Sequence, residues 1–251
     1  EPLDYTPAVL PKKEKIRLAV ARDNAFCFYY EDSLDAVREM GGELVPFSPI
    51  TDGALPENID GLYLGGGYPE LYAKELGENA SMRASVRAAL ERGVPCIAEC
   101  GGFMYLLDAI GDHPMAGALT VAECGGFLYL GQTLEDAEGG IWPMAGVLPG
   151  QGVKVGRLVR FGYATLTARA DSLLFRAGEQ FPVHEFHHWD CTCPGDAFAA
   201  EKPTGRRWEC AAASDTLYAG YPHFHFYSNL EFLYSFYDAC IKEKHRHDGK
   251  Y

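Results

Sequence analysis

The sequence predicts an α/β protein with a central, mostly parallel sheet covered by helices on both faces and an antiparallel extension. Through the first part of the chain, short apolar runs typical of strands alternate with amphipathic runs typical of helices, joined by short loops. This alternation is the pattern of a parallel sheet. Further along, the alternation loosens, and the strand-like runs at 141–148, 161–167 and 216–221 indicate a more antiparallel part.

The bulk properties are those of an ordinary globular protein and argue against one class of partner. The chain has 251 residues, 47% of them hydrophobic and 23% charged, which is enough material for a buried core. Its formal net charge of −13 argues against a nucleic-acid surface, where a basic patch is expected. We therefore expect a protein that handles small molecules and binds no nucleic acid.

Two further observations concern the compartment in which the protein works. The sequence has no apolar run long enough to span a bilayer and no basic start followed by an apolar signal core. Its eight cysteines are scattered rather than arranged as a disulfide scaffold, which fits reduced thiols. The sequence therefore predicts a cytoplasmic protein with no membrane partner.

The chain divides into a linker, one domain and a tail. Residues 1–15 carry three prolines and then charged residues, a composition typical of linkers. The strand-like and helix-like runs fall within residues 16–244, which we expect to form a single domain. Residues 245–251 form a polar tail.

Strands and helices alternate through the first half of this domain. The helix expected at 31–40 places Leu34 and Val37 on one side and ends at Gly41 and Gly42. The last expected helix repeats apolar and aromatic residues at helical spacing, which is typical of core packing. The expected strands in this half are 16–21, 43–47, 59–64 and 94–100. A second helix is expected at 79–92, and the last helix spans 229–242.

Two nearly identical stretches, 98–106 and 122–130, are the most informative feature of the chain. Each places a cysteine, Cys100 or Cys124, after an apolar strand-like run and before two glycines. This is the layout of a nucleophile elbow, in which a sharp turn from strand to helix lifts a side chain clear of the sheet. The amides at the helix start can lower the thiol pKa and hold an oxyanion. One active site needs one elbow, so the duplication leaves open which copy acts.

A glycine loop and a late pair of histidines complete a candidate cysteine-dependent site. Gly65, Gly66 and Gly67 follow a strand, so their N–H groups can point at an oxyanion at the carboxyl edge of the sheet. His223 and His225 lie between a strand and the last helix, and in an extended segment they point to the same side. One of them can act as the base for a thiol, or both can simply form hydrogen bonds in the core.

A third cluster, at residues 184–193, combines histidines, cysteines and acids, including Glu185 and His187. These residue types bind zinc, but the Cys-x-Cys spacing is too short and no second cysteine pair closes a site. We therefore expect no metal here and a surface or substrate-facing segment. The chain also lacks a Gly-x-x-x-x-Gly-Lys-Ser/Thr phosphate loop, so ATP binding through that motif is not expected.

Together these parts make the chain recognisable. It resembles the glutamine amidotransferase domains of cobyrinic acid a,c-diamide synthases and, more distantly, those of cobyric acid synthases. The resemblance runs from residue 16 to about residue 235 and includes the Ala-Glu-Cys-Gly-Gly elbow. The other stretches that carry it are 19–30, 45–49, 65–70, 143–149, 184–187 and 221–226.

The resemblance implies a flavodoxin-like class I glutaminase fold and a Cys–His mechanism. In such enzymes the elbow cysteine attacks the carboxamide of glutamine, ammonia leaves, and water hydrolyses the glutamyl thioester. The family nucleophile falls on Cys100 or Cys124, and the family base on His223. His225 stands where many class I glutaminases have an orienting glutamate, so we expect a dyad. The oxyanion amides implied by the resemblance are those of Gly66 or Gly67 and of Gly101 or Gly125.

The resemblance also implies partners and cofactors beyond this chain. In the full enzymes, ammonia travels to an amino-terminal synthetase domain, where ATP activates a carboxylate of a corrin precursor in cobalamin biosynthesis. We therefore expect no cofactor in this chain, ATP and Mg²⁺ in the synthetase half, and a synthetase domain or subunit as the partner. Residues 1–15 then correspond to an interdomain linker, and the chain to a glutaminase half or a separate subunit.

The duplication extends beyond the cysteines, because residues 114–119 echo residues 143–148. One copy of the unit is therefore an insertion. Cys100 has the better entry, a helix ending at Gly93 followed by a buried strand, whereas the residues after Cys124 follow the family pattern more closely. Because a strand that folds with its preceding helix can occupy the central position first, we favour Cys100.

Three alternatives stay open from the sequence. Residues 118–124 could occupy the central position instead, with residues 94–117 looped out. The inserted copy could also spoil the elbow and leave a non-catalytic module that only docks to a synthetase. Finally, the amidated acceptor could be another tetrapyrrole or a cell-wall precursor, because the absent half binds it.

Overall fold

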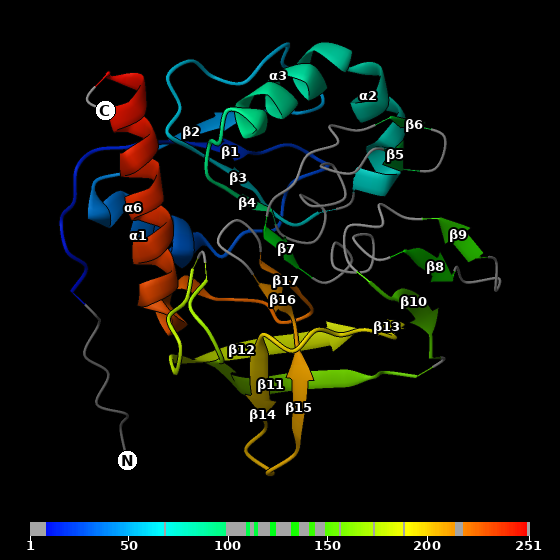
Figure 1. The fold of residues 1–251 in the computed structure, drawn as a ribbon. Helices are drawn as coiled ribbons and strands as arrows, with labels where there is room; N and C mark the ends of the chain where they lie inside the picture. Colours follow the sequence, from blue (N-terminus) through cyan, green and yellow to red (C-terminus); the bar gives the residue numbers. More distant parts are fainter. Residues whose placement is uncertain are drawn as a thin grey trace.

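A seven-stranded sheet forms the centre of the protein (Figure 1). The computed structural model describes residues 9–67, 69–98, 109–110, 113–114, 121–123, 132–135, 141–143, 149–155, 157–172, 174–187, 189–213 and 218–249. The strand order is β16 (Ala212–Ala213), β17 (Tyr218–Gly220), β7 (Val121–Glu123), β4 (Cys96–Ala98), β3 (Gly61–Leu64), β1 (Arg17–Ala21) and β2 (Glu43–Phe47). Every neighbouring pair is parallel except β16 with β17. The predicted α/β fold is therefore confirmed.

Helices cover both faces of this sheet, because successive strand residues point to opposite sides. Leu18 and Val20 of β1 belong to a core shared with the first and last helices, whereas Ala19 and Ala21 belong to a core shared with the helices of residues 73–91. None of the helices in the described ranges is long and apolar enough to cross a bilayer. The helices are α1 (Glu31–Met40), α2 (Ala73–Glu78), α3 (Ala80–Glu91) and α6 (Leu230–His247), with short 3-10 turns η1 (Pro69–Tyr72) and η2 (Phe226–Ser228).

The elements predicted for the first half agree closely with the structure. α1 and β2 have the expected bounds, and Gly41 ends α1 with a left-handed φ of 114°. The last helix was expected to end at residue 242 but continues to His247. Its final turns contact the segment before β1, where Lys244 and His245 lie 2.9 and 2.8 Å from the Glu14 carboxylate. These long-range contacts explain why a helical pattern alone placed the end too early.

The antiparallel extension forms two four-stranded sheets. Their orders are β13-β10-β8-β9, in which β10 and β8 are parallel, and β12-β11-β14-β15, in which every pair is antiparallel. Strands were expected at 161–167 and 141–148, and the structure has β11 and β9 there, residues 144–148 lying outside the described residues. The run at 216–221, which we also expected in this part, was placed wrongly, because β17 lies in the central sheet and pairs in parallel with β7. The remaining strands are β5 (Ala109–Ile110), β6 (His113–Pro114), β8 (Thr133–Glu135), β9 (Ile141–Pro143), β10 (Gln151–Lys154), β11 (Arg160–Ala168), β12 (Gln180–His187), β13 (Trp189–Cys191), β14 (Phe198–Glu201) and β15 (Arg207–Cys210).

Both copies of the duplicated stretch contribute a strand to the central sheet. β4 precedes Cys100, β7 precedes Cys124, and the two strands pair in parallel, with Ala98 opposite Ala122. Our expectation that only one copy occupies the central position is therefore corrected. Two parallel neighbours need a crossover of about a dozen residues or more, and the duplicated unit supplies that length of chain between them.

Candidate functional site

The parallel strands end at one edge of the sheet, and the glycine loop and the histidine segment follow strands that end there. β3 runs into Gly65, and β17 is followed by the segment that carries His223. Ligands bind at the carboxyl edge of such sheets. Four of the predicted site residues lie outside the described residues, namely Cys100, Gly101, Cys124 and Gly125.

His223 is held by a backbone bridge to β12. Its N–H donates to the carbonyl of His184 at 2.9 Å, and the N–H of His184 donates to the carbonyl of His223 at 3.2 Å. β12 itself pairs with β11 along its full length. The bridge therefore fixes the main chain of the candidate base against a continuous antiparallel ladder.

A cavity of about 430 Å³ lies beside this bridge, within the usual size range of small-molecule sites. Three histidines line it, His184, His223 and His225, together with Tyr30 and Tyr163. Burial and the neighbouring His223 lower the pKa of His184 below its ordinary value of 6.5. The His184 imidazole is therefore neutral near pH 7 and can accept one hydrogen bond.

His225 faces an acidic residue that the sequence did not indicate. Its Nε2 lies 3.0 Å from a carboxylate oxygen of Asp32, and its ring meets Tyr30 edge-on with centroids 4.9 Å apart. Asp32 lies in the first turn of α1, where acidic residues commonly complement the helix dipole. An acidic residue in a first helical turn is ordinary, so no local pattern in the sequence connects Asp32 with the site.

The glycine loop lies against the segment before α1. The N–H of Gly66 donates to the carbonyl of Phe28 at 3.2 Å, and its carbonyl accepts from the N–H groups of Cys27 and Phe28, both at 3.0 Å. Within the described part of the chain, the N–H of Gly67 has no hydrogen-bond acceptor. A Cβ on Gly67 would overlap the carbonyl oxygen of Ala25, so this close approach requires glycine. Of the two predicted loop donors, Gly67 is therefore the one whose amide lacks an acceptor among the residues that the structure describes.

The cluster at residues 184–193, which we expected to be a surface or substrate-facing segment, contains both buried and cavity-lining residues. Glu185 and His187 are only 2% and 5% exposed, 3.3 Å apart, and the His187 ring stacks on Tyr221 with centroids 3.7 Å apart. The expectation was wrong for these two residues, because alternation along β12 turns them inward while His184 lines the cavity. Arg160 lies 3.9 Å from the Glu185 carboxylate. Among the described residues, no three His, Cys, Asp or Glu side chains are grouped to hold a metal.

The strand that leads to the glycine loop and the strand that leads to His223 adjoin different copies of the duplicated stretch. β4 lies next to β3, which leads to the glycine loop, and Ala98 pairs with Leu64. β7 lies next to β17, and Glu123 pairs with Gly220, which precedes His223 by three residues. β7 separates β4 from β17 by two strand spacings, about 10 Å.

Comparison with known proteins gives one family. The model of the CobB/CobQ-like glutamine amidotransferase domain matches residues 17–117 and, separately, residues 107–231. The first match contains Cys100 and the second contains Cys124. Two overlapping matches of this kind are the expected result of a duplicated unit.

Two curated relatives have the same name. The cobyrinate a,c-diamide synthase of Caldanaerobacter subterraneus subsp. tengcongensis is 36% identical over 91% of this chain and 46% of the relative. That of Priestia megaterium is 34% identical over 95% of this chain and 47% of the relative. A crystal structure of a glutamine amidotransferase is 15% identical and gives a TM-score of 0.48, covering 89% of this chain and 98% of that chain. The chain thus spans about half the length of the curated relatives that it matches.

Proposed function

We propose that this chain, which belongs to the family of CobB/CobQ-like glutamine amidotransferase domains, hydrolyses glutamine and supplies ammonia to a cobyrinate a,c-diamide synthase. One observation carries the proposal: the strand that leads to an elbow cysteine lies next to the strand that leads to His223, beside a cavity lined by that histidine. A thiol, a base and a substrate-sized cavity are the parts that such a hydrolysis needs.

We assign the nucleophile to Cys124 and the base to His223. A base must come within hydrogen-bond reach of the thiol that it deprotonates. Cys124 follows directly after Glu123, and Glu123 pairs with β17. Cys100 follows β4, a strand spacing further from β17. The strand order therefore favours Cys124, although the entry of the chain into β4 had favoured Cys100.

The proposed reaction uses these residues in two steps. His223 takes the proton of the Cys124 thiol, the thiolate attacks the carboxamide carbon of glutamine, and the amide of Gly125 stabilises the oxyanion. For the Gly67 amide to be the second donor, its loop, which follows β3, must extend across the end of β4 toward Cys124. His223 then protonates the leaving nitrogen, so ammonia departs and a glutamyl thioester remains. Water attacks the thioester with His223 as the base, which releases glutamate and restores the thiol.

The ammonia would serve a synthetase part that this chain does not include. The relatives are about twice as long as their match to this chain, and we assign ATP and Mg²⁺ to the remainder. Around the cavity, Tyr30 and Tyr163 are 54% and 74% exposed, with Phe28 and Phe161 exposed nearby in sequence. Exposed aromatic side chains gathered at one site suit burial by a second protein part.

Ammonia release from glutamine tests the proposal directly. The purified chain is assayed alone and with the separately produced remainder of the Priestia megaterium relative. We expect glutamate and ammonia in equal amounts and no release by the double variant Cys100→Ser/Cys124→Ser, which removes both candidate thiols. Absence of hydrolysis by the wild-type chain in both conditions would leave the non-catalytic docking module as the better explanation.

A further inference from the structure

One tyrosine connects the glycine loop to the neighbouring strand. The Tyr29 hydroxyl accepts a hydrogen bond from the N–H of Gly65 at 2.9 Å and donates one to the carbonyl of Ala21. Ala21 is the last residue of β1, and Gly65 is the first residue after β3. A single side chain therefore joins the carboxyl ends of two adjacent parallel strands, at the edge where the proposed reaction takes place.

The Tyr29 ring is itself held on several sides. It meets the ring of Tyr63 edge-on with centroids 5.2 Å apart, and the guanidinium of Arg22 lies 5.8 Å from its centroid. A Cβ on Gly65 would overlap this ring, so the loop main chain packs directly against it. Packing on both sides leaves the hydroxyl little freedom to move relative to the loop.

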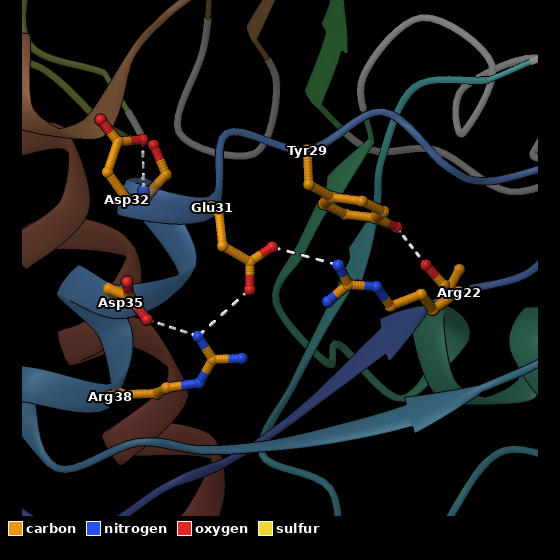
Figure 2. Close-up of polar contacts among 8 residues, drawn as sticks. Arg22, Tyr29, Glu31, Asp32, Asp35 and Arg38 are labelled. Carbon is orange, nitrogen blue, oxygen red and sulfur yellow. Dashed lines mark hydrogen bonds and ion pairs between the residues drawn. The ribbon is translucent and has the colours of Figure 1, made fainter.

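Ion pairs hold the segment around Tyr29 to helix α1. Arg22 lies 3.0 Å from one carboxylate oxygen of Glu31, and Arg38 lies 3.4 Å from the other. Figure 2 shows Glu31 between these two arginines, with the Tyr29 hydroxyl directed at the main chain beside Arg22. The segment that carries Tyr29 is thus connected to α1 through Arg22 and Glu31.

The N–H groups of the three loop glycines differ in their hydrogen-bond acceptors. Gly65 donates to Tyr29, Gly66 donates to the carbonyl of Phe28, and Gly67 has no acceptor among the described residues. We infer that Tyr29 is a positioning residue that holds this loop so that the Gly67 amide is the donor to the oxyanion. The inference rests on the proposed glutaminase function and adds to it a residue that acts through the glycine loop.

Removing one oxygen atom tests the inference. The Tyr29→Phe variant keeps the ring and its packing but loses the acceptor for Gly65. The matched control is Tyr237→Phe, because the Tyr237 hydroxyl also donates to a main-chain carbonyl, that of Glu14 at 3.0 Å. Glu14 precedes β1, at the opposite end of that strand from Ala21.

The readouts are kcat and KM for glutamine hydrolysis under the conditions given above, together with amide hydrogen exchange of the loop. For Tyr29→Phe we expect kcat to fall about tenfold, KM to stay within about twofold, and exchange at Gly65 to accelerate. Tyr237→Phe should match the wild type in kcat. Unchanged kcat in Tyr29→Phe, or an equal fall in both variants, would overturn the inference alone, whereas an inactive wild type would overturn the proposed function with it.

Discussion

At the scale of single residues, the structure gives the two histidines of the Tyr221–Phe226 segment different surroundings. His223 is fixed through its main chain by the bridge to His184, and His225 is bound through its side chain to Asp32. A general base needs a ring nitrogen that can reach the thiol proton. Because His223 follows Gly220 by three residues and Gly220 pairs with Glu123, the residue before Cys124, we assign proton transfer to His223.

This assignment predicts unequal losses of activity. His223→Asn should lower kcat for glutamine hydrolysis by about a thousandfold, within the range that general bases contribute. His225→Asn should lower it by less than about tenfold, since it removes the pair with Asp32 but leaves the base. Steady-state kinetics of the two variants, with circular dichroism as the folding control, checks this. A larger loss in His225→Asn would reverse the two roles.

The other site residues show why spacing alone located only part of the site. Gly66 and Gly67 were found because glycines after a strand are a local signal. The structure then distinguished their amides, because the N–H of Gly66 donates to the carbonyl of Phe28. Asp32 reaches His225 from almost two hundred residues away in the sequence, which no local pattern reports. Contacts of this kind depend on how α1 packs against η2, the turn that follows His225, so they had to come from the structure.

At the scale of elements, local patterns predicted the first half of the sheet well and the antiparallel part incompletely. β1, β2 and β3 are short apolar runs bounded by turns, which is a strong local signal. β12 was not predicted, because Pro182 and Glu185 interrupt its apolar alternation. Its partner β11 supplies the ladder that makes this sequence a strand.

The end of α6 predicts a dependence of stability on pH. Hydrogen bonds from Lys244 and His245 lower the pKa of Glu14 to about 2. Since this folded value lies below that of the unfolded chain, the contribution is present in full above about pH 4.5 and disappears as the pH falls toward 2. We expect Glu14→Gln to unfold at lower urea concentration than the wild type at pH 6, and the difference to shrink by pH 3. A difference that stays constant from pH 6 to pH 3 would contradict this account of the helix end.

At the scale of the whole molecule, the duplication changes which strands are neighbours. With β4 and β7 both in the sheet, one elbow strand adjoins the glycine-loop strand and the other adjoins the histidine strand. The sequence revealed the duplication but not this order, because each copy is preceded by a short apolar strand-like run and neither run identifies its neighbours. The order follows from pairing across the assembled sheet.

Deleting one copy of the duplicated stretch should leave a single elbow strand that adjoins both β3 and β17. Deleting residues 101–124 joins Cys100 directly to Gly125 and restores one Ala-Glu-Cys-Gly-Gly sequence. We expect the remaining strand to lie between β3 and β17, and kcat/KM for glutamine hydrolysis to rise above that of the full chain. A folded deletion variant with lower kcat/KM than the full chain would show that the second copy contributes to the site.

The most direct test of the central assignment compares two single substitutions in the glutaminase assay. Because β7 adjoins β17 and β4 does not, Cys124→Ser should abolish the release of ammonia from glutamine, and Cys100→Ser should retain most of it. Loss of activity in Cys100→Ser with activity preserved in Cys124→Ser would contradict the account.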